Sequence, residues 1–262
     1  MRRLSQQWLM LALLLNLALL NSIHQPWAFE RPTEPRTGYT IVARIPHDPS
    51  AFTQGFLFHD GAFYESTGLY GQSSLRRLDA NTGEVLQQLD LPANLFGEGL
   101  VLVDDRLIQL TWREGLALVY DRDTFTPLGE FHYATEGWGL TFDGQQLIMT
   151  DGSDLLYFRA PDTFQLQGTR RVTEQGQPVS RLNELEYING EVWANVFMTN
   201  DIVRIDPDTG RVIARHDFSD LLSPADRHGH EDVLNGIAYD AVEQRLFITG
   251  KRYGFIYQIE FP

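Results

Sequence analysis

The stretch NGIAYDAVEQRLFITG, residues 235–250, contains the pattern that decides the fold of this chain. A short apolar segment, a polar turn and a second apolar segment predict two antiparallel strands joined as a hairpin. The pattern occurs four more times, in QGFLFHDGAFYEST (54–67), EGLVLVDDRLIQLT (98–111), WGLTFDGQQLIMTD (138–151) and ELEYINGEVWANV (184–196). With Gly55, Gly99, Gly139, Leu185 and Gly236 taken as equivalent, successive repeats are 44, 40, 46 and 51 residues apart. A period of this size indicates a repeat architecture.

A second repeat alternates with the first. Its four copies are SLRRLDANTGEVLQQLDL (74–91), LALVYDRDTFTPLGEFHY (116–133), LLYFRAPDTFQLQGTRRV (155–172) and DIVRIDPDTGRVIARHDF (201–218). Each copy is predicted to form two strands around a turn of the D-x-x-T type. One unit therefore holds four antiparallel strands in about 40–50 residues, which is the length of a β-propeller blade.

The fifth unit is incomplete at the C-terminus. The segment GFIYQIEFP (254–262) supplies its third strand, and the segment YTIVARIP (39–46) has the pattern expected of the missing fourth strand. We therefore predict an all-β, five-bladed β-propeller over residues 39–262, with four antiparallel strands per blade. Pairing of the N-terminal strand with the last blade would close the ring and remove an open sheet edge.

The first 22 residues, MRRLSQQWLMLALLLNLALLNS, differ from the rest. Arg2 and Arg3 precede an apolar run from Trp8 to Leu20, as in a secretory signal peptide. The run is short for a membrane-spanning helix. We predict a signal peptide in residues 1–28, cleaved after residue 21 or later. Because no clear small-residue cleavage motif is present, an uncleaved N-terminal anchor is the alternative.

Composition narrows the compartment and the partners. The chain has no cysteine, which excludes disulfides, thiolate metal sites and a cysteine nucleophile. Export without disulfides is typical of a bacterial periplasm, so we expect a periplasmic or secreted protein. Without residues 1–22 the chain has 19 basic and 35 acidic residues and a formal charge of −16. Nucleic acid and anionic membranes are therefore not expected partners. We expect a monomer whose acidity either attracts a cationic substrate or only aids solubility.

Propeller geometry brings distant parts of the sequence to one end of the ring, which we call the mouth. The first strand of each blade starts there and the second strand ends there. The residues expected at the starts are Gln54, Glu98, Trp138, the pair Asn183–Glu184, and Asn235; those expected at the ends are Thr67, Trp112, Asp151, Asn195 and Lys251. The side chains predicted to lie at the mouth therefore include amides, carboxylates and indoles.

Lys251 is the single lysine among 21 basic residues. Arginine serves wherever else the chain has a cation, so a general surface role does not explain this choice. An ammonium is a compact charge with three rotatable donors, which suits a small site that holds a carbonyl oxygen or a carboxylate. A chance lysine in a loop is the alternative.

Over nearly all of residues 39–262 the chain resembles the plant- and bacterial-type glutaminyl cyclases, the glutaminyl-peptide cyclotransferases. The matching stretches are FTQG (52–55), YESTGLYGQSS (64–74), FGEGL (96–100), LTW (110–112), EGWGLT (136–141), LNELEYINGEVWANV (182–196), LNGIAYD (234–240) and FITGK (247–251). The resemblance implies a five-bladed propeller that cyclises the N-terminal glutamine of peptides or proteins to pyroglutamate and releases ammonia. It also implies that no cofactor and no catalytic metal take part.

The resemblance assigns roles to residues of the predicted mouth. Glu98, in the FGEG motif, would shuttle protons from the attacking amine to the departing ammonia, as a general acid–base does. Lys251 or Asn183 would stabilise the oxygen that becomes negative, and the sequence does not choose between them. Gln54 and Asn183 are candidate hydrogen-bond partners for the substrate amide and its first peptide bond. The remaining assignments are to an apolar wall that excludes water, formed by Phe52, Phe96, Trp112, Trp138 and Trp193. For each indole, core packing is the competing interpretation.

Two other functions remain open. The segment SPADRHGHEDVLNG (223–236) places His228 and His230 in an H-x-H pattern beside Glu231 and Asp232, which can hold zinc or copper, although a solvated loop with two histidines is the more common origin of such a pattern. A separate alternative is a metal-dependent propeller hydrolase of the lactonase type, which would use Glu98, Asn183 and Asp residues around a divalent cation at the axis. A propeller that only binds a peptide is the other. The fold does not choose among the three functions.

Overall fold

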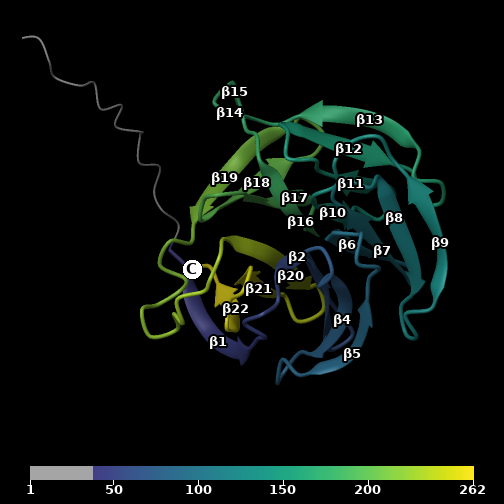
Figure 1. Ribbon diagram of the computed structural model, residues 1–262. Helices are drawn as coiled ribbons and strands as arrows, with labels where there is room; N and C mark the ends of the chain where they lie inside the picture. The colour runs from purple at the N-terminus through teal and green to yellow at the C-terminus, as the bar shows by residue number, and fades with distance from the viewer. Residues whose placement is uncertain (1–37) are drawn as a thin grey trace, which may run out of the picture. The chain divides into compact units, whose positions relative to one another are not determined.

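The computed structural model describes residues 38–262, which form strands and loops without a helix. The predicted signal peptide, residues 1–28, lies outside this described part. Nothing in residues 38–262 is a helix of the length and apolarity needed to cross a membrane. Five sheets surround a common axis, so the predicted five blades are all present (Figure 1).

Blades 1 and 2 are four-stranded and antiparallel, with strands in sequence order. Blade 1 consists of β2 (Thr53–His59), β3 (Ala62–Thr67), β4 (Ser74–Asp79) and β5 (Val85–Asp90). Blade 2 consists of β6 (Gly97–Val103), β7 (Arg106–Thr111), β8 (Leu116–Asp121) and β9 (Pro127–His132). The first strands β2 and β6 lie next to the axis, and β5 and β9 lie at the perimeter (Figure 1).

Blades 3 and 4 follow the same order, but blade 4 is larger than predicted. Blade 3 consists of β10 (Leu140–Phe142), β11 (Leu147–Met149), β12 (Leu155–Arg159) and β13 (Leu166–Arg171). Blade 4 consists of β16 (Leu182–Ile188), β17 (Glu191–Val196), β18 (Asp201–Asp206) and β19 (Arg211–Asp217). A short hairpin, β14 (Thr173–Glu174) and β15 (Gln177–Pro178), pairs parallel with the outer edge of β19 and makes this sheet six-stranded.

Blade 5 combines the two ends of the described chain. Its inner strands are β20 (Leu234–Asp240), β21 (Arg245–Gly250) and β22 (Phe255–Glu260), and its outer strand is β1 (Thr40–Pro46). β1 pairs antiparallel with β22, from Thr40 opposite Glu260 to Pro46 opposite Phe255. The outer edge of the last blade is therefore occupied by the strand that leads directly into blade 1.

The hydrophobic core is divided among the five contacts between neighbouring blades. Between blades 1 and 2, for example, Leu57 and Tyr64 pack with Leu100 and Leu107. Equivalent clusters fill the contacts between blades 2 and 3, 3 and 4, 4 and 5, and 5 and 1. Alternation of side chains along each strand supplies apolar groups to both faces of every sheet, so each blade needs a neighbour on both sides.

The first strands of blades 1, 2, 4 and 5 share an irregularity near the mouth. Their pairing with the second strand shifts between Thr53 and Gly55, Gly97 and Leu100, Leu182 and Leu185, and Leu234 and Ile237. A bulge inserts a residue into one strand and redirects its side chains. The register also corrects the sequence alignment by one position in blade 4: Glu184, not Leu185, corresponds to Gly236.

Close approach at the axis explains the glycines at this position. A Cβ on Gly99 would lie 2.6 Å from Leu140 N, and one on Gly139 would lie 2.0 Å from the carbonyl oxygen of Asn183. Only glycine lets the backbones of neighbouring first strands come this near. In blade 4 the corresponding Glu184 instead reaches across the axis with its carboxylate. Its Oε1 accepts from Phe56 N of blade 1 at 3.3 Å, and its Oε2 accepts from Ile237 N of blade 5 at 2.8 Å.

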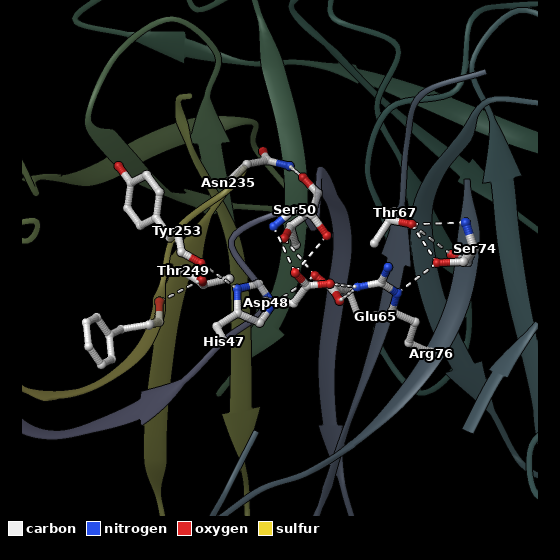
Figure 2. Close-up of polar contacts among 12 residues, drawn as sticks. His47, Asp48, Ser50, Glu65, Thr67, Ser74, Arg76, Asn235, Thr249 and Tyr253 are labelled. Carbon is white, nitrogen blue, oxygen red and sulfur yellow. Dashed lines mark hydrogen bonds and ion pairs between the residues drawn. The ribbon is translucent and has the colours of Figure 1, made fainter. Parts of the chain in front are cut away.

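A buried ion pair lies where blade 5 passes into blade 1 (Figure 2). His47, directly after β1, donates from Nδ1 to the Tyr253 carbonyl at 3.0 Å and from Nε2 to Glu65 Oε1 at 3.1 Å. Both partners accept, so the ring carries both protons. Burial by itself lowers the pKa of His47, but the Glu65 carboxylate raises it above 6.5 overall; burial raises the pKa of Glu65, but His47, Arg76 and Thr53 lower it overall.

We expect His47→Gln to destabilise the protein by about 3 kcal/mol, because the substitution leaves Glu65 buried without its cation. The stabilisation by His47 is complete below the unfolded-state pKa of 6.5 and is lost as the pH rises through the higher folded-state pKa. The stabilisation by Glu65 is complete above its unfolded-state pKa of 4.5 and is lost as the pH falls through the lower folded-state pKa. The difference in Tm between wild type and variant should therefore be greatest between pH 4.5 and pH 6.5, and it should become smaller at alkaline pH.

Thermal unfolding over a pH series measures this difference. His132→Gln is the matched control, because the His132 side chain is 74% exposed and pairs only with the surface residue Glu130. A Tm difference for His47→Gln that is independent of pH would contradict the ion-pair interpretation.

Candidate active site

Hydrogen bonds join the starts of the first strands of blades 5, 1 and 2. Gln54 Nε2 donates to Glu98 Oε1 at 2.9 Å. Asn235 Nδ2 donates to the Thr53 carbonyl at 3.0 Å and to Gln54 Oε1 at 3.5 Å. Gln54, which the sequence assigns to substrate binding, thus uses both ends of its amide to connect Asn235 with Glu98. These polar side chains occupy the bulged positions of their strands. The bulges redirect the side chains, so that they meet one another at the mouth.

Glu98 is buried, which is unusual for a carboxylate, and only 4% of the residue is exposed. Burial raises the pKa of Glu98 well above its usual range, the Lys251 ammonium opposes this rise, and the carboxylates of Glu136 and Glu114 add to it. A carboxyl group whose pKa is moved toward neutrality can both accept and release a proton, which is the property of a general acid–base.

Lys251 directly follows β21 and is 3% exposed. Its Nζ lies 4.8 Å from the ring centroid of Phe52 and 5.0 Å from that of Phe197. Burial lowers the pKa of Lys251, while Glu98 and Asp232 raise it in part. Lys251 lowers the pKa of Glu98 and Glu98 raises that of Lys251, so the charges of the single lysine and of this carboxylate stabilise each other.

Asn183 takes the place of Glu98 in blade 4. Its backbone carbonyl accepts from Thr150 Oγ1 at 2.8 Å. Its Oδ1 is buried and has no hydrogen-bond partner among residues 38–262, and Asn235 Oδ1 is in the same state. Because buried polar atoms are normally paired, these two oxygens are available to a bound molecule.

A closed circuit of side chains lies at the mouth, and we call it the aromatic rim. It consists of five rings with Glu136 and Lys251 between them: Phe52, Phe96, Trp112, Trp138 and Phe197. Ring centroids are 6.3 Å apart for Phe52–Phe96, 5.4 Å for Phe96–Trp112 and 5.5 Å for Trp138–Phe197. Glu136 Oε2 accepts from both indole nitrogens, at 2.8 Å from Trp112 and 3.0 Å from Trp138. All five blades contribute to this circuit.

Phe197 is the rim residue that sequence analysis missed. It comes one residue after β17 ends at Val196, as Trp112 comes one residue after β7 and Lys251 one residue after β21. The sequence contained this signal, but the end of the second strand in blade 4 was predicted at Asn195. The side chain of Asn195 instead accepts from Gly236 N at 3.0 Å and joins blades 4 and 5.

Trp193 does not join the other two indoles, contrary to its predicted place in the wall. It lies in the core between blades 4 and 5, stacked on His216 at 5.5 Å and packed against Phe261 at 5.9 Å. The reason is its distance along the strand. Trp193 stands three residues before the end of β17, and each residue advances a strand by about 3.3 Å.

The H-x-H segment is engaged in structural contacts. His228 Nε2 donates to the Arg252 carbonyl at 3.0 Å, and Glu231 accepts from the backbone N–H groups of His228 and Gly229. Within residues 38–262 no group of three or more His, Asp or Glu side chains is arranged to hold a metal ion. The contacts of Glu231 and His228 hold the loop before β20 in place.

Comparisons with known proteins identify the family of this chain. Residues 11–261 match the family described as glutamine cyclotransferase. A glutaminyl-peptide cyclotransferase of Arabidopsis thaliana is 44% identical over 226 residues, covering 84% of this chain and 70% of that protein. The crystal structure of Myxococcus xanthus glutaminyl cyclase has a TM-score of 0.79 and 38% identity, covering 85% of this chain and 95% of that one. The predicted resemblance is confirmed, and the chain belongs to the glutamine cyclotransferase family.

Proposed function

We propose that this protein is a glutaminyl-peptide cyclotransferase, which converts the N-terminal glutamine of peptides or proteins to pyroglutamate and releases ammonia. One observation of the site supports this most directly: Glu98 is a buried carboxylate of raised pKa whose charge interacts with that of the single lysine, and Lys251 itself lies against two rings of the aromatic rim. The names and identities of the two relatives point to the same activity.

The reaction is intramolecular, so positioning is a large part of the catalysis. The α-amine of the substrate attacks its own γ-carboxamide carbon, one nitrogen–carbon bond forms, and the bond to the departing ammonia breaks. An α-amine titrates near pH 7.7–8.0 in model peptides, so the neutral nucleophile is accessible. Rings of the rim would hold the glutamine side chain folded back on the amine, and near-attack geometry lowers the barrier by several kcal/mol.

Glu98 is the proposed proton shuttle. Its carboxylate accepts a proton from the attacking amine and delivers it to the leaving nitrogen, so the carboxylate is regenerated in each turnover. Gln54 holds Oε1 by a 2.9 Å hydrogen bond. Burial raises the pKa of Glu98 above that of an ordinary carboxyl group, which makes its carboxylate a stronger base toward the attacking amine.

Lys251 is the proposed donor to the developing oxyanion. Lys251 is the single lysine of the sequence, and the N–H donors of its ammonium can rotate toward an oxyanion. The unpaired Oδ1 of Asn183 supports a different task for that residue, because an oxygen accepts and would suit the N–H groups of the substrate. These assignments separate the two residues that the sequence alone left equivalent.

We also propose that residues 1–28 direct export, on the basis of the charged start and the apolar run in the sequence. Intact mass of the protein recovered from an expressing bacterium tests this. A soluble exported chain cleaved between residues 21 and 28 is expected. A full-length chain retained in the membrane fraction would instead establish the uncleaved anchor.

Mass spectrometry of a glutamine-initiated dipeptide incubated with the purified protein and EDTA tests the activity. We expect the peptide to lose the mass of one ammonia, and we expect Glu98→Gln to slow the reaction about 10²- to 10⁴-fold, because a positioned acid–base contributes that much. Glu130→Gln, on the outer strand β9 of the same blade, is the control. Unchanged peptide mass, or a change that EDTA eliminates, would contradict the proposal and favour the binding or metal-dependent alternatives.

We expect Lys251→Met to lower kcat about 10²- to 10³-fold, as loss of an oxyanion donor does. The Lys251 ammonium lowers the pKa of Glu98, so its removal should also move the acid limb of the pH–rate profile to higher pH. Asn183→Ala, measured in parallel, gives the comparison. A smaller loss for Lys251→Met than for Asn183→Ala would transfer the oxyanion role to Asn183.

A further inference from the structure

Glu136 is a carboxylate at the site that the proposed reaction does not use. It precedes β10 in blade 3, and a single oxygen, Oε2, accepts hydrogen bonds from Trp112 Nε1 at 2.8 Å and Trp138 Nε1 at 3.0 Å. Trp112 belongs to blade 2 and Trp138 to blade 3. One acceptor thus connects two indoles of the aromatic rim across the boundary between two blades.

The other oxygen of Glu136 is engaged as well. Oε1 accepts from Arg113 Nε at 3.2 Å, and the Arg113 guanidinium lies 3.7 Å from the ring centroid of Trp112. Burial raises the pKa of Glu136, but the bonds from Trp138, Trp112 and Arg113 outweigh it and lower the pKa overall. The carboxylate therefore accepts from three donors at once, with the indoles on one oxygen and the guanidinium on the other.

The repeat pattern makes this residue exceptional. Blades 1 and 2 enter their first strands with FTQG (52–55) and FGEG (96–99), in which an aromatic ring for the rim comes two residues before the polar side chain. Blade 3 has EGWG (136–139), in which the carboxylate and the aromatic residue have exchanged places. Glu136 thus stands where Phe52 and Phe96 stand, and Trp138 stands where Gln54 and Glu98 stand. If blade 3 had the order of blades 1 and 2, position 136 would carry an aromatic ring, and no hydrogen-bond acceptor from this position would lie beside the indoles.

We propose that Glu136 is a positioning residue, which fixes the two indoles in the orientation that binds the glutamine side chain of the substrate. This inference rests on the proposed function. Each indole has two side-chain torsions, and a hydrogen bond at its nitrogen restricts both. A buried or partly buried acceptor with no indole partner would be unfavourable, so the carboxylate and the two rings hold one another. Small displacements of such walls are costly for catalysis.

Two substitutions separate hydrogen bonding from charge. Glu136→Leu removes the acceptor, and we expect kcat/KM for a glutamine-initiated dipeptide to fall about 10- to 100-fold, mainly through a higher KM. Glu136→Gln keeps a side-chain oxygen that can accept from both indoles, so it should stay within about threefold of wild type. Similar losses in both variants would show that the charge matters, and normal kinetics in both would show that the residue is dispensable; either result would overturn the proposal.

A mutant cycle tests whether Glu136 acts through the indoles. The Trp112→Phe/Trp138→Phe double variant has no indole N–H to be held. Adding Glu136→Leu to it should therefore produce no further rise in KM, whereas the same substitution raises KM in wild type. Additive effects would overturn the proposal. Glu130→Leu, an exposed carboxylate on β9, controls for the loss of one negative charge.

Spectroscopy of the full chain labelled with ¹⁵N at its tryptophan indoles gives a readout independent of turnover. The signals of Trp112 and Trp138, identified by their loss in the two Phe variants, should shift in Glu136→Leu and stay in place in Glu136→Gln. The signal of Trp193 should not move, because that ring lies in the core between blades 4 and 5. Unshifted signals in Glu136→Leu would overturn the positioning role.

The kinetic result distinguishes failure of this inference from failure of the proposed function. If wild type does not cyclise the dipeptide, the function fails, and the inference that rests on it falls with it. If wild type is active and Glu136→Leu has an unchanged KM, only the positioning role fails. A variant that is merely less well folded would have a lower apparent kcat with the same KM.

Discussion

The structure depends on how five first strands meet at one axis. Bulges in four of them interrupt the pairing near the mouth, and backbone groups freed in this way need other partners. Glycines at the next position let neighbouring backbones approach within contact distance. In blade 4 Glu184 replaces the glycine, and its carboxylate accepts N–H groups from blades 1 and 5. This one side chain joins three blades at the point where they are closest.

The same irregularity produces the chemistry of the mouth. The bulged positions hold Gln54, Glu98, Asn183 and Asn235, so the residues that leave the regular ladder are the polar groups of the site. Packing around the axis removes water from them. Burial then raises the pKa of Glu98 and lowers that of Lys251, as is common for titratable groups at functional sites.

Closure of the ring and completion of the site are connected. β1 pairs with β22, and the residues that follow β1 are fixed by the buried His47–Glu65 pair before the chain enters blade 1. Phe52 and Gln54 come next, while Lys251 arrives from blade 5, with Arg252 N bonded to the Ala51 carbonyl at 2.6 Å. The first and last segments of the described chain therefore supply adjacent parts of the aromatic rim.

The sequence alone determined the architecture, because hairpin pattern and repeat period are local properties: five units of strand and turn, and the place of Gln54, Glu98, Trp112, Trp138 and Lys251 at one mouth, follow from counting. Distances along a strand decided the rest. In blade 4, counting two residues beyond Asn195 would have included Phe197, and Trp193 is excluded because it lies three residues before Val196, the last residue of β17. Only the tertiary structure decided that Gln54 bonds to Glu98, that Glu184 crosses the axis and that Glu136 holds two indoles from different blades. The bonds Trp112–Glu136, Gln54–Glu98 and Phe56–Glu184 join residues 24, 44 and 128 positions apart in the chain, and such partners are selected by how blades pack rather than by any local pattern.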